Sequence, residues 1–237
     1  MDTWKNDMWS IFELNMCEHS IFKKITAAAQ QLGFDYCAYG LQLPLPLTAP
    51  KVVILDNYPD AWRDRYSAAQ YVKHDPAVLH GRRTQAPLIW SASSFCHAPE
   101  LWEEANAYGI NVGWSQSHID LVGASGMLSV SRSAQKLSPS ERADIESKLI
   151  WLVSIAHSSL SRAITHRHRK EQDPCLTPRE MEVLKWTADG KSASEISEIL
   201  VVTKHTIDFH IKNAVHKLKA CNKTAAVVRA AMLGLLT

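Results

Sequence analysis

The last quarter of the chain combines sequences that can cap helices with apolar residues at helical spacing. TPRE (177–180) and SASE (192–195) are capping-box sequences, and Thr203 and Asn222 can each cap a further helix. The apolar stripe after Thr203, with spacings of four, four and three, consists of Ile207, Ile211, Val215 and Leu218. The pattern predicts a small helical bundle in which the second and third helices, joined by a tight turn, form a helix-turn-helix.

A longer amphipathic pattern begins at SPSE (138–141), another capping-box sequence, with proline at the first helical position. The apolar stripe of this predicted helix consists of Ile145, Leu149, Leu152, Val153, Ala156, Leu160 and Ile164. Such a stripe can pack on its own domain or form a contact with a second subunit. The pattern favours neither interpretation.

The rest of the chain mixes helical and strand-like periodicity. Helical patterns occur near residues 7–31, 59–69 and 99–108. Strand-like runs occur at 36–43, 51–56, 112–120 and 125–132. The last two runs flank the short segment LVGA, which predicts a hairpin. We therefore predict an α+β fold: an α/β/α sandwich with an antiparallel sheet, followed by a four-helix helix-turn-helix domain.

The polar segment THRHRKEQDPC (165–175) interrupts the apolar periodicity on both sides and ends in Asp-Pro, so we expect a linker there. The expected organisation is a first domain over 1–164, the linker over 165–175 and a second domain over 176–237. Residues 174–237 hold nine Lys/Arg against six Asp/Glu, a net charge of +3, whereas residues 1–173 hold seventeen against eighteen, a net charge of −1. A basic tail domain points toward nucleic acid.

Composition excludes several other classes of protein. The five cysteines are far apart and form no CxxC pair, so we expect neither a disulfide framework nor a thiolate metal site. The closest histidines, His166 and His168, lie among cations that would repel a metal ion. No apolar run approaches the roughly 18 residues of a membrane span, and the start, MDTWKNDMW, lacks the apolar region of a signal peptide. We expect a cytoplasmic protein that does not bind membranes.

Aromatic residues concentrate in DNYPDAWRDRYSAAQYVKHDP (56–76), where Tyr58, Trp62 and Tyr66 recur every four positions and would share one face of a helix. Buried tyrosine and tryptophan need partners for their O–H and N–H groups, and a buried aspartate needs donors. A core of this kind requires a polar guest or a closed hydrogen-bond network. The candidate site residues of the first domain are Tyr58, Trp62, Tyr66, Asp75, Trp90 and Ser129.

A catalytic arrangement would pair Asp75 with Tyr58, or Ser129 with a histidine such as His118. No nucleophile elbow, phosphate loop or metal-ligand spacing supports it. We therefore predict no catalytic residues, no metal site and no enzyme.

The chain as a whole resembles the LuxR-type quorum-sensing transcription regulators. The segments that carry the resemblance are NYPDAWRDRY, DP, LIW, GW, MLSVSR and LTPREMEVLKWTADGKSASEIS, so it covers essentially the whole chain. The positions typical of the family are Trp62, Tyr66, Asp75, Pro76, Trp90, Gly113, Glu180, Leu184 and Gly190. The resemblance implies that the first domain binds an N-acyl-homoserine lactone as its signal ligand, with no other cofactor.

The resemblance also implies a role for each polar residue. The indole N–H of Trp62 would donate to the lactone carbonyl, and Asp75 would accept from the amide N–H of the ligand. Tyr58 and Ser129 would donate to the acyl carbonyl. The chemistry agrees, because a ligand with one amide donor and two carbonyls on an apolar body needs one acceptor and several donors in an apolar cavity.

Tyr66 and Trp90 are assigned to packing, around the acyl chain and the lactone ring respectively. The implied partners are double-stranded promoter DNA, a second copy of the chain in a homodimer and, for an activator, RNA polymerase. A ligand that fills the cavity would also stabilise the fold by mass action. The alternative is an orphan or ligand-independent regulator of the same fold that responds to another small molecule.

A recognition helix enters the major groove with its N-terminal turns. The residues there are Lys204, His205, Asp208 and Lys212. We also expect the N-termini of two helices to bind phosphate through their free backbone N–H groups. The residues at these N-termini are Thr177, Asn222, Lys223 and Thr224.

Asp208 departs from the asparagine that is frequent in the family, since this chain has TIDFH in place of TVNFH. An aspartate can accept a hydrogen bond from a cytosine amino group, or it can pair with Lys212 one turn along the helix. We favour the pairing slightly.

Overall fold

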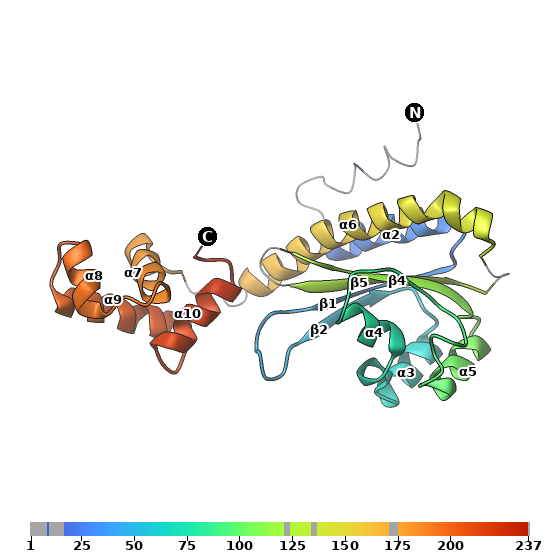
Figure 1. Cartoon of the computed structure of the whole chain (residues 1–237), viewed down its shortest axis with the longest axis horizontal. Helices are drawn as coiled ribbons and strands as arrows, with labels where there is room; N and C mark the ends of the chain where they lie inside the picture. Colours follow the sequence, from blue (N-terminus) through green and yellow to red (C-terminus); the bar gives the residue numbers. More distant parts are fainter. Residues whose placement is uncertain (1–8, 10–16, 121–123, 134–136, 171–174, 237) are drawn as a thin grey trace. The chain divides into compact units, whose positions relative to one another are not determined.

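The computed structural model describes residues 9, 17–120, 124–133, 137–170 and 175–236 (Figure 1). The chain forms two compact units, whose boundary along the sequence lies at residues 166–167. The α+β class is confirmed. In the described part of the chain, no helix is long and apolar enough to cross a membrane.

The first unit is built on a five-stranded sheet in the order β2-β1-β5-β4-β3, with every neighbouring pair antiparallel. The strands are β1 (Tyr36–Gln42), β2 (Val52–Asp56), β3 (Leu88–Ile89), β4 (Val112–Ile119) and β5 (Ser125–Arg132). The predicted pairing of the two runs around LVGA is confirmed, because β4 and β5 pair along their whole length. Successive side chains of a strand point to opposite faces, so each strand serves both layers of helices.

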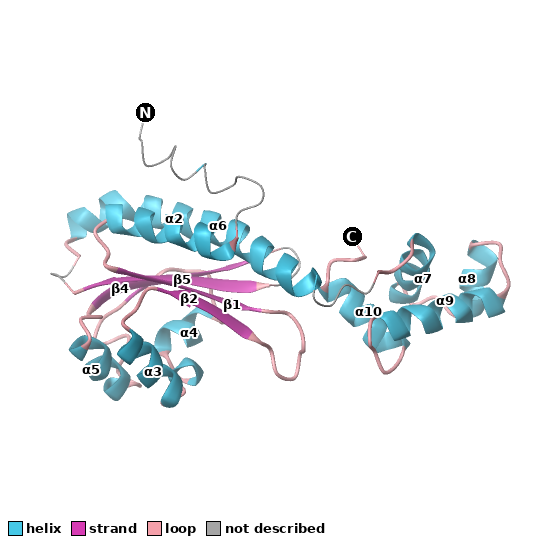
Figure 2. Ribbon diagram, turned by 180° about the vertical axis from the view of Figure 1, so that it is seen from behind, coloured by secondary structure: helices cyan, strands magenta, loops and turns pink. Residues whose placement is uncertain are grey.

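Two helices, α2 (Glu18–Gln31) and α6 (Pro139–Lys170), cover one face of the sheet (Figures 1 and 2). Ser138 Oγ accepts a hydrogen bond from the Glu141 backbone N–H at 3.1 Å, so the predicted cap of α6 forms. The stripe of α6 packs on its own domain: Leu152, Ala156 and Leu160 are each fully buried in the core under this layer.

One helix extends past its expected end, and only part of the helix expected near 7–31 falls on described residues. Helix α6 continues to Lys170, so residues 165–170 of the expected linker are helical. Polar side chains there do not end the helix, because an exposed helical turn needs no apolar stripe. Helix α2 begins at Glu18, and the earlier part of the expected 7–31 helix falls largely on residues 1–8 and 10–16, outside the described residues.

The other face of the sheet is covered by short elements: α3 (Asp60–Ala68), the 3-10 turn η2 (Tyr71–Lys73), α4 (Pro76–Gly81) and α5 (Pro99–Ala107) (Figure 2). The predictions for 59–69 and 99–108 are confirmed by α3 and α5. The sequence pattern did not reveal η2, α4 or β3, because each is too short to show a period.

The second unit contains α7 (Pro178–Ala188), α8 (Ala193–Ile199), α9 (Lys204–Lys217) and α10 (Lys223–Met232). The four predicted caps are confirmed. Thr177, Ser192, Thr203 and Asn222 each accept a hydrogen bond from the backbone N–H three residues later. Ion pairing also fixes the bundle, since Lys217 of α9 donates to the buried Glu180 of α7 at 2.8 Å.

Candidate functional site

Trp62 lies at the centre of an aromatic cluster beneath α3. It is only 4 % exposed, and its ring lies 5.4 Å from Tyr108, 5.7 Å from Tyr66 and 6.3 Å from Tyr71, measured between ring centroids. Tyr66 follows one helical turn after Trp62, so the predicted shared face is confirmed. No described residue accepts a hydrogen bond from the Trp62 indole N–H, which leaves this donor available to a ligand.

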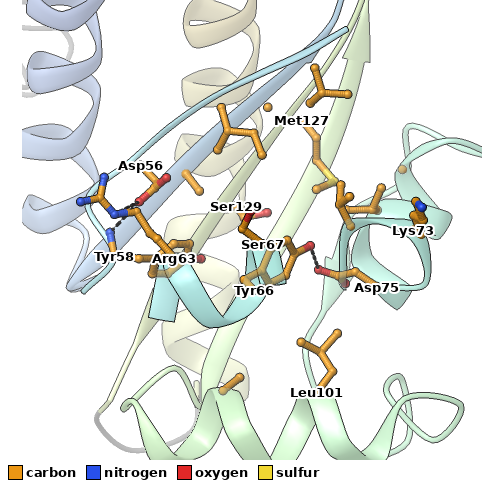
Figure 3. A pocket seen from close by; sticks show the side chains of 18 of the residues that line it. Asp56, Tyr58, Arg63, Tyr66, Ser67, Lys73, Asp75, Leu101, Met127 and Ser129 are labelled. Atoms are coloured by element: carbon orange, nitrogen blue, oxygen red, sulfur yellow. Dashed lines mark hydrogen bonds and ion pairs between the residues drawn. The ribbon is translucent and has the colours of Figure 1, made fainter. Parts of the chain in front are cut away.

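Asp75 caps the start of α4, and both of its carboxylate oxygens accept hydrogen bonds. Oδ1 accepts from the Ala77 backbone N–H and Oδ2 accepts from the Tyr66 hydroxyl, each at 2.8 Å (Figure 3). Burial raises the pKa of Asp75, and the hydrogen bond from Tyr66 opposes that rise. Each carboxylate oxygen accepts about two hydrogen bonds, so capacity remains for another donor.

The hydroxyl of Tyr66 makes a contact in addition to the expected packing of its ring around the acyl chain. Its donation to Asp75 stabilises the ionised carboxylate and holds the side chain in place. The pKa of Tyr66 is raised well above its ordinary value by burial and by Asp75, so the phenol stays protonated and remains a donor. The sequence indicated only that Asp75, once buried, needs donors, and it did not single out Tyr66 as one of them.

Trp90 forms a wall of the site and starts a chain of hydrogen bonds. Its indole N–H donates to Ser115 Oγ at 2.9 Å, and Ser115 Oγ lies 2.7 Å from Ser129 Oγ on the neighbouring strand. The Trp90 ring lies against Gly113, where a Cβ atom would be 2.1 Å from ring atom Cε3. Glycine at 113 is therefore a steric requirement of this wall.

A cavity of about 510 Å³ lies between the sheet and the layer formed by α3, α4 and α5. It brings together all the site residues predicted for the first domain: Tyr58, Trp62, Tyr66, Asp75, Trp90 and Ser129. Three strands contribute alternate residues to the floor of the cavity, of which the sequence pattern pointed only to Ser129. These are Ala38, Gly40 and Gln42 of β1, Val52, Ile54 and Asp56 of β2, and Ser125, Met127 and Ser129 of β5.

The chemistry of this cavity suits a largely apolar guest with both a donor and acceptors. Asp75 offers a carboxylate acceptor, while Trp62 and Tyr58 offer donors. Burial raises the pKa of Tyr58, which keeps its hydroxyl protonated. Much of the surrounding surface is aromatic and aliphatic, and in such surroundings a polar group has more effect than in water.

On the second unit, the structure places the predicted DNA-contacting residues as follows. Those of α9, namely Lys204, His205, Asp208 and Lys212, are exposed. Those at helix starts, namely Thr177, Asn222, Lys223 and Thr224, are also exposed. Thr177 and Asn222 already cap their own helices, and the remaining first-turn N–H groups are the ones open to phosphate.

The pairing that we favoured for Asp208 does not form. Among the described residues, Asp208 and Lys212 make no ion pair within 4.0 Å, although they lie one turn apart on α9. The carboxylate of Asp208 is therefore exposed to solvent.

Comparison with known proteins agrees with this division into two functional parts. Residues 18–160 match the family described as "Autoinducer binding domain", and residues 174–230 match "Bacterial regulatory proteins, luxR family". The transcriptional activator protein AnoR of Acinetobacter nosocomialis is 42 % identical over 100 % of both chains.

Solved structures are similar over nearly the whole chain. Escherichia coli SdiA is 33 % identical with a TM-score of 0.85, covering 99 % of this chain and 98 % of that one. A second SdiA structure, in complex with octanoyl-rac-glycerol, is 32 % identical with a TM-score of 0.84 and covers 98 % and 95 %. The N-acylhomoserine lactone dependent factor CepR2 of Burkholderia cenocepacia is 30 % identical with a TM-score of 0.63, covering 68 % of this chain and 95 % of that one.

The cavity and the helix-turn-helix, together with these matches, define a transcription regulator that combines an autoinducer-binding domain with a DNA-binding domain. The chain belongs to the LuxR family of bacterial regulatory proteins.

Proposed function

We propose that the cavity binds an N-acyl-homoserine lactone and that this binding controls attachment of the second unit to promoter DNA. The observation that carries the proposal is a half-buried carboxylate, Asp75, that keeps acceptor capacity in a largely apolar cavity beside the free indole donor of Trp62. One amide N–H and two carbonyls on an apolar body complement such a set. A solved relative, CepR2, is described as dependent on this class of ligand.

In the proposed complex, Asp75 accepts from the amide N–H and Trp62 donates to the lactone carbonyl. Tyr58 and Ser129 donate to the acyl carbonyl. The hydrogen-bond chain supports the role of Ser129: Ser115 accepts from Trp90 and can donate to Ser129, so the Ser129 proton can point into the cavity. Tyr66 supports Asp75 through its hydroxyl.

The rest of the assembly is proposed on the same basis. The ligand-binding domain spans 1–164 and the DNA-binding domain 176–237, joined by the residues in between, part of which continue α6. The protein acts in the cytoplasm as a homodimer on double-stranded promoter DNA, with RNA polymerase as a further partner if it is an activator. It is not an enzyme, and it uses no cofactor beyond its signal ligand.

Ligand binding is proposed to stabilise the first unit. Without a guest, a cavity of about 510 Å³ leaves Asp75 buried with its raised pKa and leaves Trp62 without an acceptor. A ligand present at a hundred times its dissociation constant would add about 2.7 kcal/mol to the free energy of unfolding. Apo-protein that is as soluble, dimeric and thermally stable as liganded protein would contradict this proposal.

Mass spectrometry of an organic extract tests the ligand directly. The full chain is expressed beside a panel of acyl-homoserine lactones of different chain lengths, purified and extracted. We expect one lactone to be retained at about one per subunit and recovered intact, and the Asp75→Asn variant to retain less. Recovery of a hydrolysed lactone would indicate an enzyme instead.

The same extract separates the lactone from the alternative ligand class. SdiA has been solved with octanoyl-rac-glycerol, so monoacylglycerols are included in the panel. DNA-binding protein that retains only a monoacylglycerol, or no guest at all, would replace the lactone proposal with the orphan or ligand-independent regulator.

The exposed carboxylate of Asp208 is proposed to read a base, since its pairing with Lys212 does not form. An Asp208→Asn variant should change which base is preferred at one position of the bound DNA, because aspartate accepts from cytosine whereas asparagine pairs with adenine. Unchanged preference across a library of duplexes would exclude this role.

A further inference from the structure

Helix α9 carries an aromatic residue on the side that faces away from its own domain. The helix buries Ile207, Ala214 and Leu218 against the other helices. Successive helical residues are rotated by about 100°, so Phe209, two positions after Ile207, points about 200° away from it. Phe209 is 56 % exposed and belongs to neither hydrophobic cluster of the second unit. Its ring is therefore not part of the hydrophobic core of this unit.

The surroundings of the Phe209 ring are polar and basic. His205, Lys212 and His216 are exposed on the same outward side of α9, at four, three and seven positions from Phe209. Among the described residues, His210 contributes the one ring contact to Phe209, with centroids 5.7 Å apart in an edge-on arrangement. The helix therefore presents an exposed phenyl ring beside one lysine and several imidazoles.

The residues around Phe209 indicate what kind of partner its ring would contact. Lys212 and the hydrogen-bonding imidazoles beside the ring favour a polyanion over an apolar protein surface, and α9 is the second helix of the helix-turn-helix, the one that enters the major groove. A phenyl ring neither donates nor accepts a conventional hydrogen bond, so it gains nothing from a phosphate or from the polar edges of the bases. Among the four bases, thymine alone presents a methyl group in the major groove.

We propose that Phe209 is a specificity-determining residue that packs against the 5-methyl group of a thymine in the bound DNA. The inference rests on the proposed function, in which α9 reads the major groove. Phe209 contributes discrimination between bases, whereas Lys212 contributes attraction to phosphate that is independent of sequence.

Removal of single methyl groups from the DNA tests the proposal. The full chain, expressed beside the lactone panel, first selects duplexes from a random library. Each thymine of a selected duplex is then replaced singly by deoxyuridine, which removes only the methyl group. For wild-type protein, we expect one replacement in each half-site to weaken binding about fourfold, the effect of exposing one methyl group.

Three variants assign the effect to the ring. Phe209→Ala should bind the thymine and deoxyuridine duplexes equally, whereas Phe209→Leu should retain part of the discrimination. Lys212→Ala should bind both duplexes more weakly by the same factor and keep the discrimination. Because Phe209 is exposed, its substitution should leave the thermal unfolding of the second unit unchanged, which circular dichroism checks.

The outcomes separate this inference from the proposed function. Selected duplexes that tolerate every deoxyuridine replacement, or a replacement that weakens wild type and Phe209→Ala alike, would overturn the role of Phe209 and leave DNA binding intact. Failure to select any duplex would overturn DNA reading by α9, and this inference with it.

Discussion

The two faces of the sheet in the first unit carry layers that differ in what fills them. Under α2 and α6, side chains such as Leu41, Leu128 and Leu152 are fully buried and interlock as a closed core. Under α3, α4 and α5, the same strands instead line a cavity of about 510 Å³. One sheet thus supplies a rigid support on one side and a binding site on the other.

Glycines on neighbouring strands show the difference most directly. On the closed face, a Cβ atom at Gly126 would lie 2.4 Å from both His157 Nδ1 and the Tyr39 hydroxyl. On the cavity face, a Cβ atom at Gly40 would meet no atom within 4 Å. Side chains fill the space on the closed face, under α2 and α6, whereas the cavity face leaves room for a ligand.

The largest expected effect is loss of packing on the closed face. Leu152→Ala removes a fully buried side chain of α6 and should lower the free energy of unfolding by about 2–5 kcal/mol, measured by denaturant titration. The matched control is Ile54→Ala on the cavity face, where the side chain is 49 % exposed and the loss should stay below about 1 kcal/mol. Similar losses for both variants would mean that the two faces are equally packed.

The next largest effect is a loss of ligand affinity caused by a substitution on the cavity face. Asp75→Asn removes the charged acceptor, so affinity for the retained lactone should fall about 10–100-fold, as for other hydrogen bonds to charged groups. Because burial raises the pKa of Asp75, its ionised form is costly in the empty cavity. The variant should therefore unfold, without ligand, at the wild-type temperature or above it. A variant that loses apo stability but keeps its affinity would assign Asp75 to the core.

The two glycines give a smaller, paired effect. Gly126→Ala should cost about 1–3 kcal/mol through overpacking against His157 and Tyr39. Gly40→Ala should change stability by less than about 0.5 kcal/mol, and Gly40→Leu should weaken long-chain lactones more than short-chain ones. Chemical denaturation and competition binding measure the two properties. Equal stability costs at both positions would contradict the open space above Gly40.

The last effect, small near neutral pH, is a pH dependence that arises on the closed face. Burial, together with His118, lowers the pKa of His157 to about 4, although Asp120 opposes the shift. Neutral His157 shares a hydrogen bond with the Tyr39 hydroxyl, at 3.0 Å between Nδ1 and the hydroxyl oxygen. Between about pH 4 and 6.5 the unfolded chain binds a proton that the folded chain rejects, so stability is lost as the pH falls, by at most about 1.4 kcal/mol per pH unit.

Denaturation of the apo-protein at several pH values checks this dependence, with His157→Gln as the control that should flatten the slope. Asp75 acts in the opposite direction, because its raised pKa makes the empty fold less stable as the pH rises through it. An Asp75→Asn variant should therefore show a steeper rise of stability with pH than wild type. An unchanged slope in both variants would remove these two groups from the pH response.

Local elements were predictable because their signals are local. The caps at Thr177, Ser192, Thr203 and Asn222 were recognised from two to four letters and all formed. Long amphipathic stretches such as α6 were equally plain. The short elements η2, α4 and β3 carried no period and were missed, and α6 passed through a polar segment that resembled a linker.

The sequence by itself determined the residue types of the site and the helices and strands that carry most of them. Tertiary structure alone decided which partners they meet. Ser115 meets Ser129 through the β4–β5 register, and Tyr66 meets Asp75 only because α3 and α4 fold onto the same face. It also decided that the stripe of α6 packs on its own sheet and that the opposite face stays hollow. The physical reason is that packing and hydrogen bonding depend on distances between residues far apart in the chain, which local periodicity does not encode.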